Sequence, residues 1–198
     1  MNILELSEQE IIRRNSLNEL RAMGIDPYPA AEYVTNAFST DIKAEFKDDE
    51  EPRQVSVAGR IMSRRVMGKA SFMDLLDSTG RLQVYVRRDD VGEEDYADFK
   101  KWDIGDILGV EGTVFRTQKG EISVHTTHIK LLSKSLLPLP EKFHGLQDKE
   151  LRFRQRYVDL MVNPEVKKNF VIRSQFIKFM RNYLDNMGYM EVETPVLN

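Results

Sequence analysis

The first regular pattern of apolar residues along the chain predicts a helix near the N-terminus. It begins at the sequence SEQE, residues 7–10, in which the serine can cap the first turn and the glutamate three positions later can bond back. Gly24 supplies a stop, so we expect a helix over residues 8–23. Its apolar residues recur at helix-like spacing: Ile11, Ile12, Leu17, Leu20 and Met23.

Between residues 53 and 136 the pattern changes to short segments rich in β-branched and aromatic residues. Five such segments are separated by GK, DSTG and QKG, which are typical of turns. After the third segment, GEEDYADFKKWDIGD has the spacing of a short amphipathic helix. Three strands, a helix and two more strands are the order expected of an OB-fold, a five-stranded Greek-key barrel. A small β-sandwich or another small barrel fits the same pattern.

A long amphipathic helix follows a proline-bearing connector. Asn163 can cap this helix, Pro164 suits its first position, and Gly188 supplies a stop. The helix carries an apolar stripe that we expect to be buried, formed by Val166, Phe170, Ile177, Met180, Leu184 and Met187. After the helix we expect one strand, which is too short to enclose this stripe by itself.

These patterns together predict a mainly β chain with α-helices, organised in three parts. The parts are an N-terminal helical extension (1–52), the OB-fold barrel (53–136), and a connector that opens an incomplete domain (137–198). No stretch is long and apolar enough to span a membrane, and the N-terminus lacks the basic start and apolar core of a signal peptide. The chain has no cysteine, which excludes disulfides and thiolate metal sites, so we expect a cytoplasmic protein.

Charge is unevenly distributed along the chain. The net charge of −3 argues against indiscriminate binding to nucleic acid. Residues 53–88 nevertheless hold eight Lys or Arg against two Asp, whereas residues 89–106 hold eight acidic residues against two Lys. A basic segment in an acidic protein suits a confined contact with a polyanion. A solvated strand face beside an acidic helix would give the same distribution.

The hairpin within residues 64–86 has two different faces. Leu76 and Asp77, next to the turn, are the only residues that break the alternation of apolar and polar positions. Aligning the apolar faces across the DSTG turn pairs Leu75 with Leu82 and Met73 with Val84 in the core. The same register pairs Phe72 with Tyr85 and Asp74 with Gln83 on the opposite face.

The face opposite the core carries an aromatic ring, an amide and nearby guanidinium groups. An unpaired base can stack on the Phe72 ring, worth roughly 1–3 kcal/mol, while Gln83 and an arginine bond its edge. Alternatively, Phe72 packs under a loop and Gln83 only faces water. Other chemistry is sparse, because His125 and His128 differ by an odd number of positions and alternation places them on opposite faces, where they cannot share a metal ion.

Longer stretches of the sequence resemble a known family. GRIMSRRVMGKASFMDLLD, FKKWDIGDILGVEG and RSQFIKFMRNYLDNMGYMEVETPVL look like the N-terminal part of a bacterial class II lysyl-tRNA synthetase. GIDPYP and FHGLQDKELRFRQRYVDL favour the lysyl enzyme over its aspartyl and asparaginyl relatives. The resemblance covers nearly the whole chain from about Ser16. It implies an anticodon-binding OB-fold followed by the start of a class II catalytic domain.

The resemblance implies roles for five residues in reading a tRNA anticodon. Phe72 corresponds to the ring that stacks on the middle base, a uridine, and Gln83 and Arg65 correspond to groups that bond its edge. Glu121 corresponds to a residue near the first anticodon base. The division of labour between Arg64 and Arg65 stays open, since alternation turns them to opposite faces.

The resemblance also implies lysine-tRNA ligase chemistry for the full-length relative, which activates lysine with ATP and Mg²⁺ and transfers it to tRNA. MGYMEVETPVL matches the first class II signature, with Pro195 as its proline. That signature, with Gly188 and the preceding helix, normally builds a homodimer interface. The second and third signatures do not occur before Asn198. We therefore assign this chain no catalytic residue, metal site or cofactor, and expect it to be inactive alone.

Two other functions fit the same features. A non-catalytic OB-fold module would bind single-stranded nucleic acid in general or dock a protein partner. Residues 137–198 would instead act mainly as a dimerisation arm. Under the family interpretation, the expected partner is the anticodon loop of lysine tRNA, and no membrane is involved.

Overall fold

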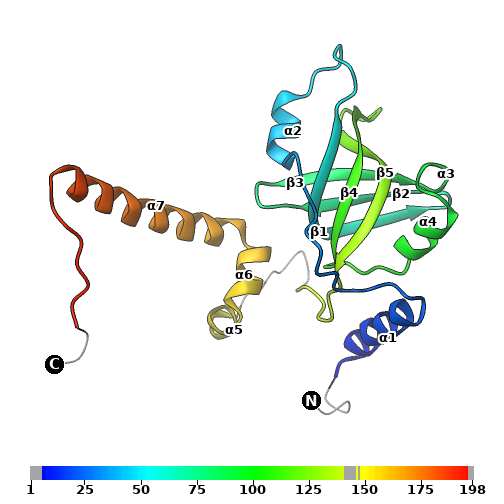
Figure 1. Cartoon of the computed structure of the whole chain (residues 1–198). Helices are drawn as coiled ribbons and strands as arrows, with labels where there is room; N and C mark the ends of the chain where they lie inside the picture. Colours follow the sequence, from blue (N-terminus) through cyan, green and yellow to red (C-terminus); the bar gives the residue numbers. More distant parts are fainter. Residues whose placement is uncertain (1–5, 141–145, 147, 196–198) are drawn as a thin grey trace. The chain divides into compact units, whose positions relative to one another are not determined.

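The computed structural model describes residues 6–140, 146 and 148–195, in two compact units divided between Pro138 and Leu139. The helices of the first unit are α1 (Glu8–Ala22), α2 (Ser39–Glu45), α3 (Arg88–Val91) and α4 (Glu93–Phe99) (Figure 1). Its strands are β1 (Gln54–Met67), β2 (Ala70–Leu76), β3 (Arg81–Arg87), β4 (Ile107–Arg116) and β5 (Ile122–Ser133). The second unit contains α5 (Lys149–Arg154), α6 (Arg156–Val162) and α7 (Pro164–Asn186).

The five strands form a closed barrel in the order β1-β2-β3-β5-β4. All neighbouring strands are antiparallel except β3 and β5, whose parallel pairing consists of Gln83–Ser123, Val84–Val124 and Tyr85–His125. The barrel confirms the predicted OB-fold, and its closure excludes the β-sandwich. The fold is mixed α and β, with two helices, α1 and α2, before the barrel and a long helix near the C-terminus.

The β2–β3 hairpin follows the predicted register, with all four expected residue pairs confirmed. Buried positions alternate along both strands, so one face of the hairpin joins the barrel core. Asp77 sits on the apolar side because it organises the turn, where its carboxylate accepts hydrogen bonds from the N–H groups of Thr79 and Gly80. Burial raises the pKa of this carboxyl, but its backbone hydrogen bonds outweigh burial and hold the pKa below its ordinary value.

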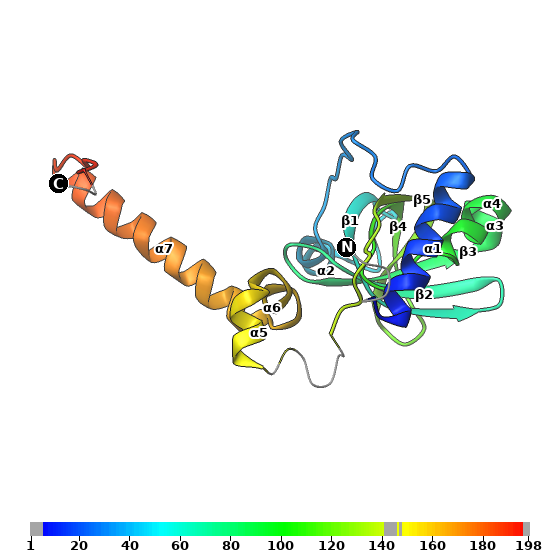
Figure 2. The same cartoon turned by 90° about the horizontal axis from the view of Figure 1, so that it is seen from below.

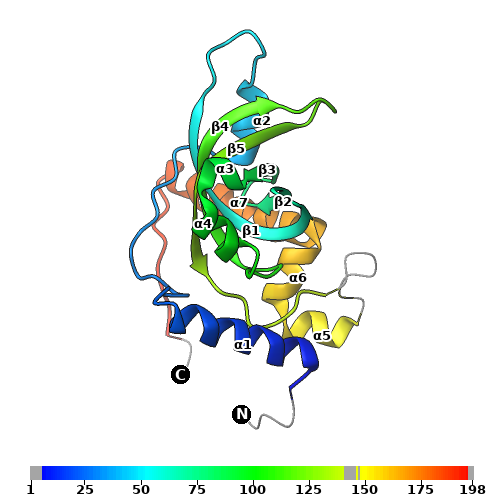
Figure 3. The same ribbon diagram turned by 90° about the vertical axis from the view of Figure 1, so that its right-hand side faces the viewer.

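Helix α1 has the predicted capping box, in which Ser7 Oγ accepts from the N–H of Glu10 and the Glu10 carboxylate accepts from the N–H of Ser7. Figure 3 shows α1 and α2 at opposite ends of the barrel. Figure 2 shows α1 beside α4, where Lys101 Nζ lies 3.0 Å from Met23 Sδ. The buried Arg13 fixes α1 to the barrel by donating to the carbonyls of Ile104 and Ser135, at 2.9 and 3.1 Å.

The segment before α2 lies against the outside of β1 and β4. The Ser56 N–H donates to the side-chain oxygen Oδ1 of Asn36, the Asn36 N–H donates back to the Ser56 carbonyl, and the Ser56 hydroxyl donates to the Val34 carbonyl. The Tyr33 ring lies directly over Gly109 of β4, where a Cβ atom would come within 2.4 Å of the ring. Only a residue without a side chain leaves room for this ring.

Helix α2 was not predicted from the sequence. Its buried Ile42 belongs to the barrel core, and its first residue, Ser39, is tied to the β2–β3 turn. The Ser39 N–H and hydroxyl both donate to the Asp77 carboxylate, at 2.6 and 2.9 Å. These contacts come from residues almost 40 positions apart, which is why local periodicity did not reveal them.

The second unit contains two short helices before α7. Asp159 is fully buried and accepts hydrogen bonds from Arg152, Arg156 and Asn163. The cap predicted for Asn163 is therefore wrong: its side-chain amide donates to Asp159 at 2.7 Å and makes no cap hydrogen bond. Pro164 does occupy the first turn of α7.

Two further expectations for α7 and its surroundings are corrected. The apolar stripe is not buried, because no residue of α7 falls in the buried class within the described part of the chain. Residues 189–195 form no strand, and residues 196–198 lie outside the described residues. Gly188 does stop the helix, with a φ of 83°, and Pro195 is exposed.

Candidate nucleic-acid interface

A groove of about 1100 Å³ lies on the outer face of the barrel and brings together four of the five residues assigned to base recognition. Arg65 comes from β1, Phe72 from β2, Gln83 from β3, and Glu121 from the end of the β4–β5 turn. The groove is lined by Arg65, Met67, Ala70, Phe72, Asp74, Gln83, Tyr85, Phe115, Thr117, Gln118, Lys119, Glu121 and His125.

A cluster of four rings forms one wall of the groove. The Phe72 and Tyr85 centroids are 4.9 Å apart, and Tyr85 lies 5.3 Å from His125 and 6.1 Å from Phe115. Phe115 and His125 in turn are 5.8 Å apart. The rings are tilted or edge-on to one another, and a cluster of this kind offers ring faces on which unpaired bases can stack.

The polar groups of the groove are held in place by neighbouring side chains. Ser123 Oγ donates to Gln83 Oε1 at 2.8 Å, and Gln83 Nε2 has no hydrogen-bond partner in the described part of the chain. The amide N–H groups are therefore free to donate to a ligand acceptor. Arg65 is exposed and lies directly opposite Phe72 in the β1–β2 register.

Arg64 is not among the residues that line this groove. Its Nη1 donates to the Phe99 carbonyl at 2.8 Å, and its guanidinium lies 5.6 Å from the centroid of the same ring. Burial lowers the pKa of the Arg64 guanidinium. Arg64 thus anchors α4 to the barrel, and Arg65 alone of the pair faces the groove.

Glu121 belongs to a tightly bonded turn at the rim of the groove. The Thr117 N–H donates to the Glu121 carbonyl, and the Glu121 N–H donates to Thr117 Oγ1, at 2.9 and 3.1 Å. The side chain of Glu121 forms a 3.0 Å ion pair with Lys43 of α2. Gly120 has a φ of 85°, a left-handed conformation that favours glycine in this turn.

Sequence reasoning missed three ring residues of the groove, namely Tyr85, Phe115 and His125. The predicted register placed Tyr85 beside Phe72, but Phe115 and His125 enter from β4 and β5, whose positions depend on barrel topology. His125 Nε2 lies 2.7 Å from Asp90 Oδ2.

The placement of His125 and His128 on opposite faces is also corrected. A bulge in the β4–β5 ladder, where Glu111 pairs with His128 and Gly112 with Thr126, breaks the alternation. His128 is therefore exposed on the outside of the barrel, as is the ring of His125 in the groove. The described residues contain no group of three His, Cys, Asp or Glu side chains arranged to hold a metal ion.

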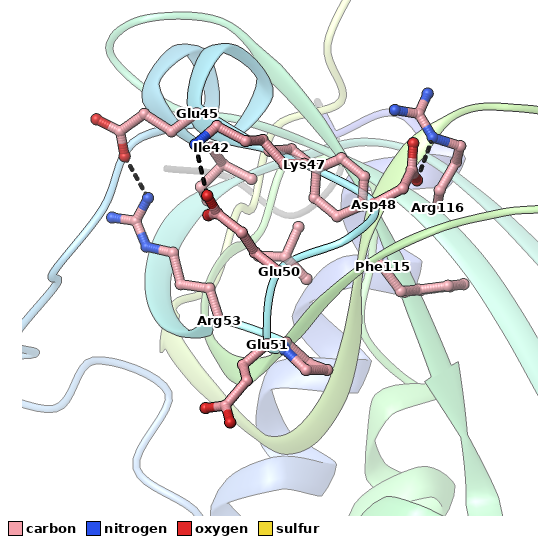
Figure 4. Close-up of a pocket in the computed structure, with 12 residues that line it drawn as sticks. Ile42, Glu45, Lys47, Asp48, Glu50, Glu51, Arg53, Phe115 and Arg116 are labelled. Atoms are coloured by element: carbon pink, nitrogen blue, oxygen red, sulfur yellow. Dashed lines mark hydrogen bonds and ion pairs between the residues drawn. The ribbon is translucent and has the colours of Figure 1, made fainter.

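A smaller pocket of about 280 Å³ lies between the segment after α2 and strand β4 (Figure 4). Phe115 and the neighbouring Arg116 line it, so it shares Phe115 with the groove. Most of its charged side chains neutralise one another in the pairs Lys47–Glu50, Arg53–Glu45 and Arg116–Asp48. This compensation makes the pocket a less suitable site for a charged ligand than the groove.

Among the helices that the structure describes, none combines the length and the hydropathy needed to cross a bilayer.

The barrel and its groove define an OB-fold nucleic-acid-binding module. Residues 55–132 match the family model described as an OB-fold nucleic acid binding domain of the tRNA anti-codon type. Residues 148–198 match the model for class II tRNA synthetases of the D, K and N group. The chain thus matches an OB-fold model in its barrel and a class II tRNA synthetase model in its last part.

More specifically, the chain is similar over almost its whole length to curated lysine-tRNA ligases. It is 56% identical over 212 residues to a lysine-tRNA ligase of Porphyromonas gingivalis, and 55% identical over 194 residues to one of Syntrophomonas wolfei. A lysine-tRNA ligase of Listeria monocytogenes is 48% identical over 200 residues. These alignments cover 98–100% of this chain but 37–40% of the relatives, so the chain spans about two fifths of their length.

Proposed function

We propose that the chain recognises the anticodon loop of lysine tRNA through the groove on its barrel. The observation that carries this proposal is the meeting of Phe72, Gln83 and Arg65, from three different strands, in one groove. In this proposal Phe72 stacks on the middle base, a uridine, while Gln83 and Arg65 donate hydrogen bonds to its edge. The neighbouring rings extend the stacking surface, and Glu121 contacts the first anticodon base.

The chemistry of the groove supports recognition of an unpaired base. Uracil carries two carbonyl oxygens, and the Gln83 amide presents free N–H groups while its oxygen is occupied by Ser123. The Arg65 guanidinium supplies donors only. Gln83 and Arg65 thus place hydrogen-bond donors on two sides of the Phe72 ring, where they can bond to acceptors on the edge of a stacked base. Such contacts are the usual basis of single-stranded RNA recognition.

The test is equilibrium binding of lysine-tRNA anticodon stem-loops that differ only at the middle base. The uridine stem-loop should bind most tightly, and Phe72→Ala should weaken that binding by roughly 1–3 kcal/mol, the loss of one stacked base. Leu76→Ala is the matched control, because Leu76 is half-buried on the same strand but lies outside the groove. Its affinity should equal that of the unaltered chain.

Gln83→Ala should reduce the preference for uridine by a similar magnitude, about 1–3 kcal/mol for a good edge contact. Equal affinity for all middle bases would refute the base-reading role. Binding of unrelated single-stranded oligonucleotides as tightly as the stem-loop would instead support a general single-strand-binding module.

For the longer relatives to which this chain corresponds, we propose attachment of lysine to tRNA in the cytoplasm, with ATP and Mg²⁺ as cofactors. The proposal also includes a homodimer that uses α7, Gly188 and Pro195. It is supported by the exposed apolar side chains of α7, including Phe176 at 64% and Phe179 at 66% exposure. Sedimentation equilibrium tests the dimer: a chain that stays monomeric at high concentration would contradict this interface.

A further inference from the structure

Helix α2 connects two turns at the same end of the barrel. Its first residue, Ser39, is bonded to the β2–β3 turn through Asp77, and Lys43, one helical turn later, pairs with Glu121 of the β4–β5 turn. Between them, Ile42 is 1% exposed and belongs to the barrel core. The helix is therefore anchored independently of Lys43, so the backbone that carries the Lys43 side chain is fixed relative to the groove.

The backbone of the β4–β5 turn is also held from outside the groove. Arg116 Nη1 donates to the Gly120 carbonyl at 3.3 Å, and Arg116 Nε donates to Asp48 Oδ1 at 2.8 Å. The guanidinium lies 5.1 Å from the centroid of Phe46, a residue of the segment after α2. With the turn backbone fixed in this way, the remaining freedom of Glu121 is that of its side chain.

Lys43 restricts that freedom at one carboxylate oxygen. Its Nζ lies 3.0 Å from Glu121 Oε1, whereas Oε2 accepts no hydrogen bond in the described part of the chain. A carboxylate accepts hydrogen bonds and cannot donate them, so Oε2 is suited to a base that presents an N–H group. The ion pair also neutralises a negative charge that would otherwise repel nearby phosphates.

We propose that Lys43 positions Glu121 for base recognition and so sets specificity at the first anticodon base. The proposal rests on the proposed anticodon-binding function and adds to it a residue outside the groove. Lys43 is a positioning residue, because it acts through the Glu121 carboxylate and does not line the groove itself. Orientation of the carboxylate by a fixed cation reduces the side-chain entropy lost when a base binds.

The experiment uses the 198-residue chain and four anticodon stem-loops, one for each base at the first anticodon position, with uridine kept in the middle. Lys43→Met should reduce the affinity ratio between the best and the worst stem-loop by about two- to fivefold, the range expected for an exposed ion pair. Lys43→Arg should restore the ratio, because a guanidinium can also hold Oε1. Lys47→Met is the matched control, since Lys47 is exposed nearby and pairs with Glu50 instead.

A double-mutant cycle separates positioning from a general charge effect. In the Glu121→Gln background, Lys43→Met should no longer change the ratio, because the carboxylate that Lys43 positions is gone. An equal loss of affinity for all four stem-loops would overturn the proposal, and so would additive effects of the two substitutions. If Phe72→Ala weakens binding but Lys43→Met leaves the ratio unchanged, this inference fails alone; if neither has an effect, the proposed function fails.

Discussion

Substitution of Gly109 by alanine should destabilise the barrel through one contact, that with Tyr33. A Cβ atom at position 109 would lie 2.4, 2.5 and 2.7 Å from three atoms of the Tyr33 ring, where ordinary contact begins at 3.4 Å. The ring would have to retreat by about 1 Å, which a close-packed contact does not allow without rearrangement. The three atoms are Cζ, Cε2 and Cε1, at the hydroxyl-bearing end of the ring, so relief of the clash requires the Tyr33 ring to swing away from β4.

Two opposing effects set the magnitude. Introducing excess volume at a packed site typically costs about 1–3 kcal/mol. Replacing glycine by alanine within a strand returns roughly 0.5–1 kcal/mol, because the unfolded chain loses conformational freedom. The free energy of unfolding should therefore fall by about 1–2 kcal/mol, which corresponds to a decrease in Tm of about 2–8 °C for a chain of this size.

Thermal melts followed by circular dichroism measure this decrease, and the decisive comparison is made in the Tyr33→Ala background. Without the ring, Gly109→Ala has no clash and should become neutral or stabilising. The sign of the effect should thus reverse between the two backgrounds. A similar loss of stability in both would refute the assignment of the cost to the Tyr33 ring.

Three further predictions concern charged residues. Arg65→Ala should weaken RNA binding without changing the Tm, whereas Arg64→Ala should lower the Tm. Equal effects of the two substitutions in binding and melting experiments would contradict the placement of Arg65 in the groove and of Arg64 against α4. Lys134→Met leaves the buried Asp106 without its cation and should lower the free energy of unfolding by about 3–5 kcal/mol, measured by urea titration. A loss below about 1 kcal/mol would mean that this buried ion pair contributes no more than a surface ion pair. The pKa of Asp77 lies below its ordinary value of 3.8 in the folded state, so its stabilisation is present above that value and is lost as the pH falls through the folded-state pKa. Asp77→Asn should therefore be less stable than the unaltered chain at neutral pH, with a difference that disappears in acid, and a difference independent of pH would argue against this role.

The sequence predicted the barrel well because alternation along its strands is strong. In the β2–β3 hairpin, alignment of the apolar faces across the short DSTG turn gave the observed register, which also places Phe72 beside Tyr85. Helix α2 escaped prediction because its position is set by contacts with the distant Asp77. The connector likewise hid α5 and α6, whose arrangement depends on the buried Asp159.

The candidate site was predictable only in part, for a similar reason. Strand parity placed Phe72 and Gln83 on one face, and the family resemblance supplied Arg65 and Glu121. Parity assigned opposite faces to Arg64 and Arg65 but did not show which one faced the groove, since that depends on where α4 packs. The rings from β4 and β5 could be found only once the barrel closure was known, because they lie at least 30 positions from Gln83 in sequence.

The short parallel ladder between β3 and β5 closes the barrel with three residue pairs, far fewer than the other ladders. Its three pairs join segments about 40 residues apart, so few contacts offset the loop-closure entropy, and we expect this seam to be the weakest of the five ladders. Gln83, Tyr85 and His125 lie on the seam and also line the groove. A chain that has folded its hairpins but has not paired β3 with β5 lacks a complete groove. A bound anticodon should therefore slow amide hydrogen exchange in β3 and β5 more than in the other strands.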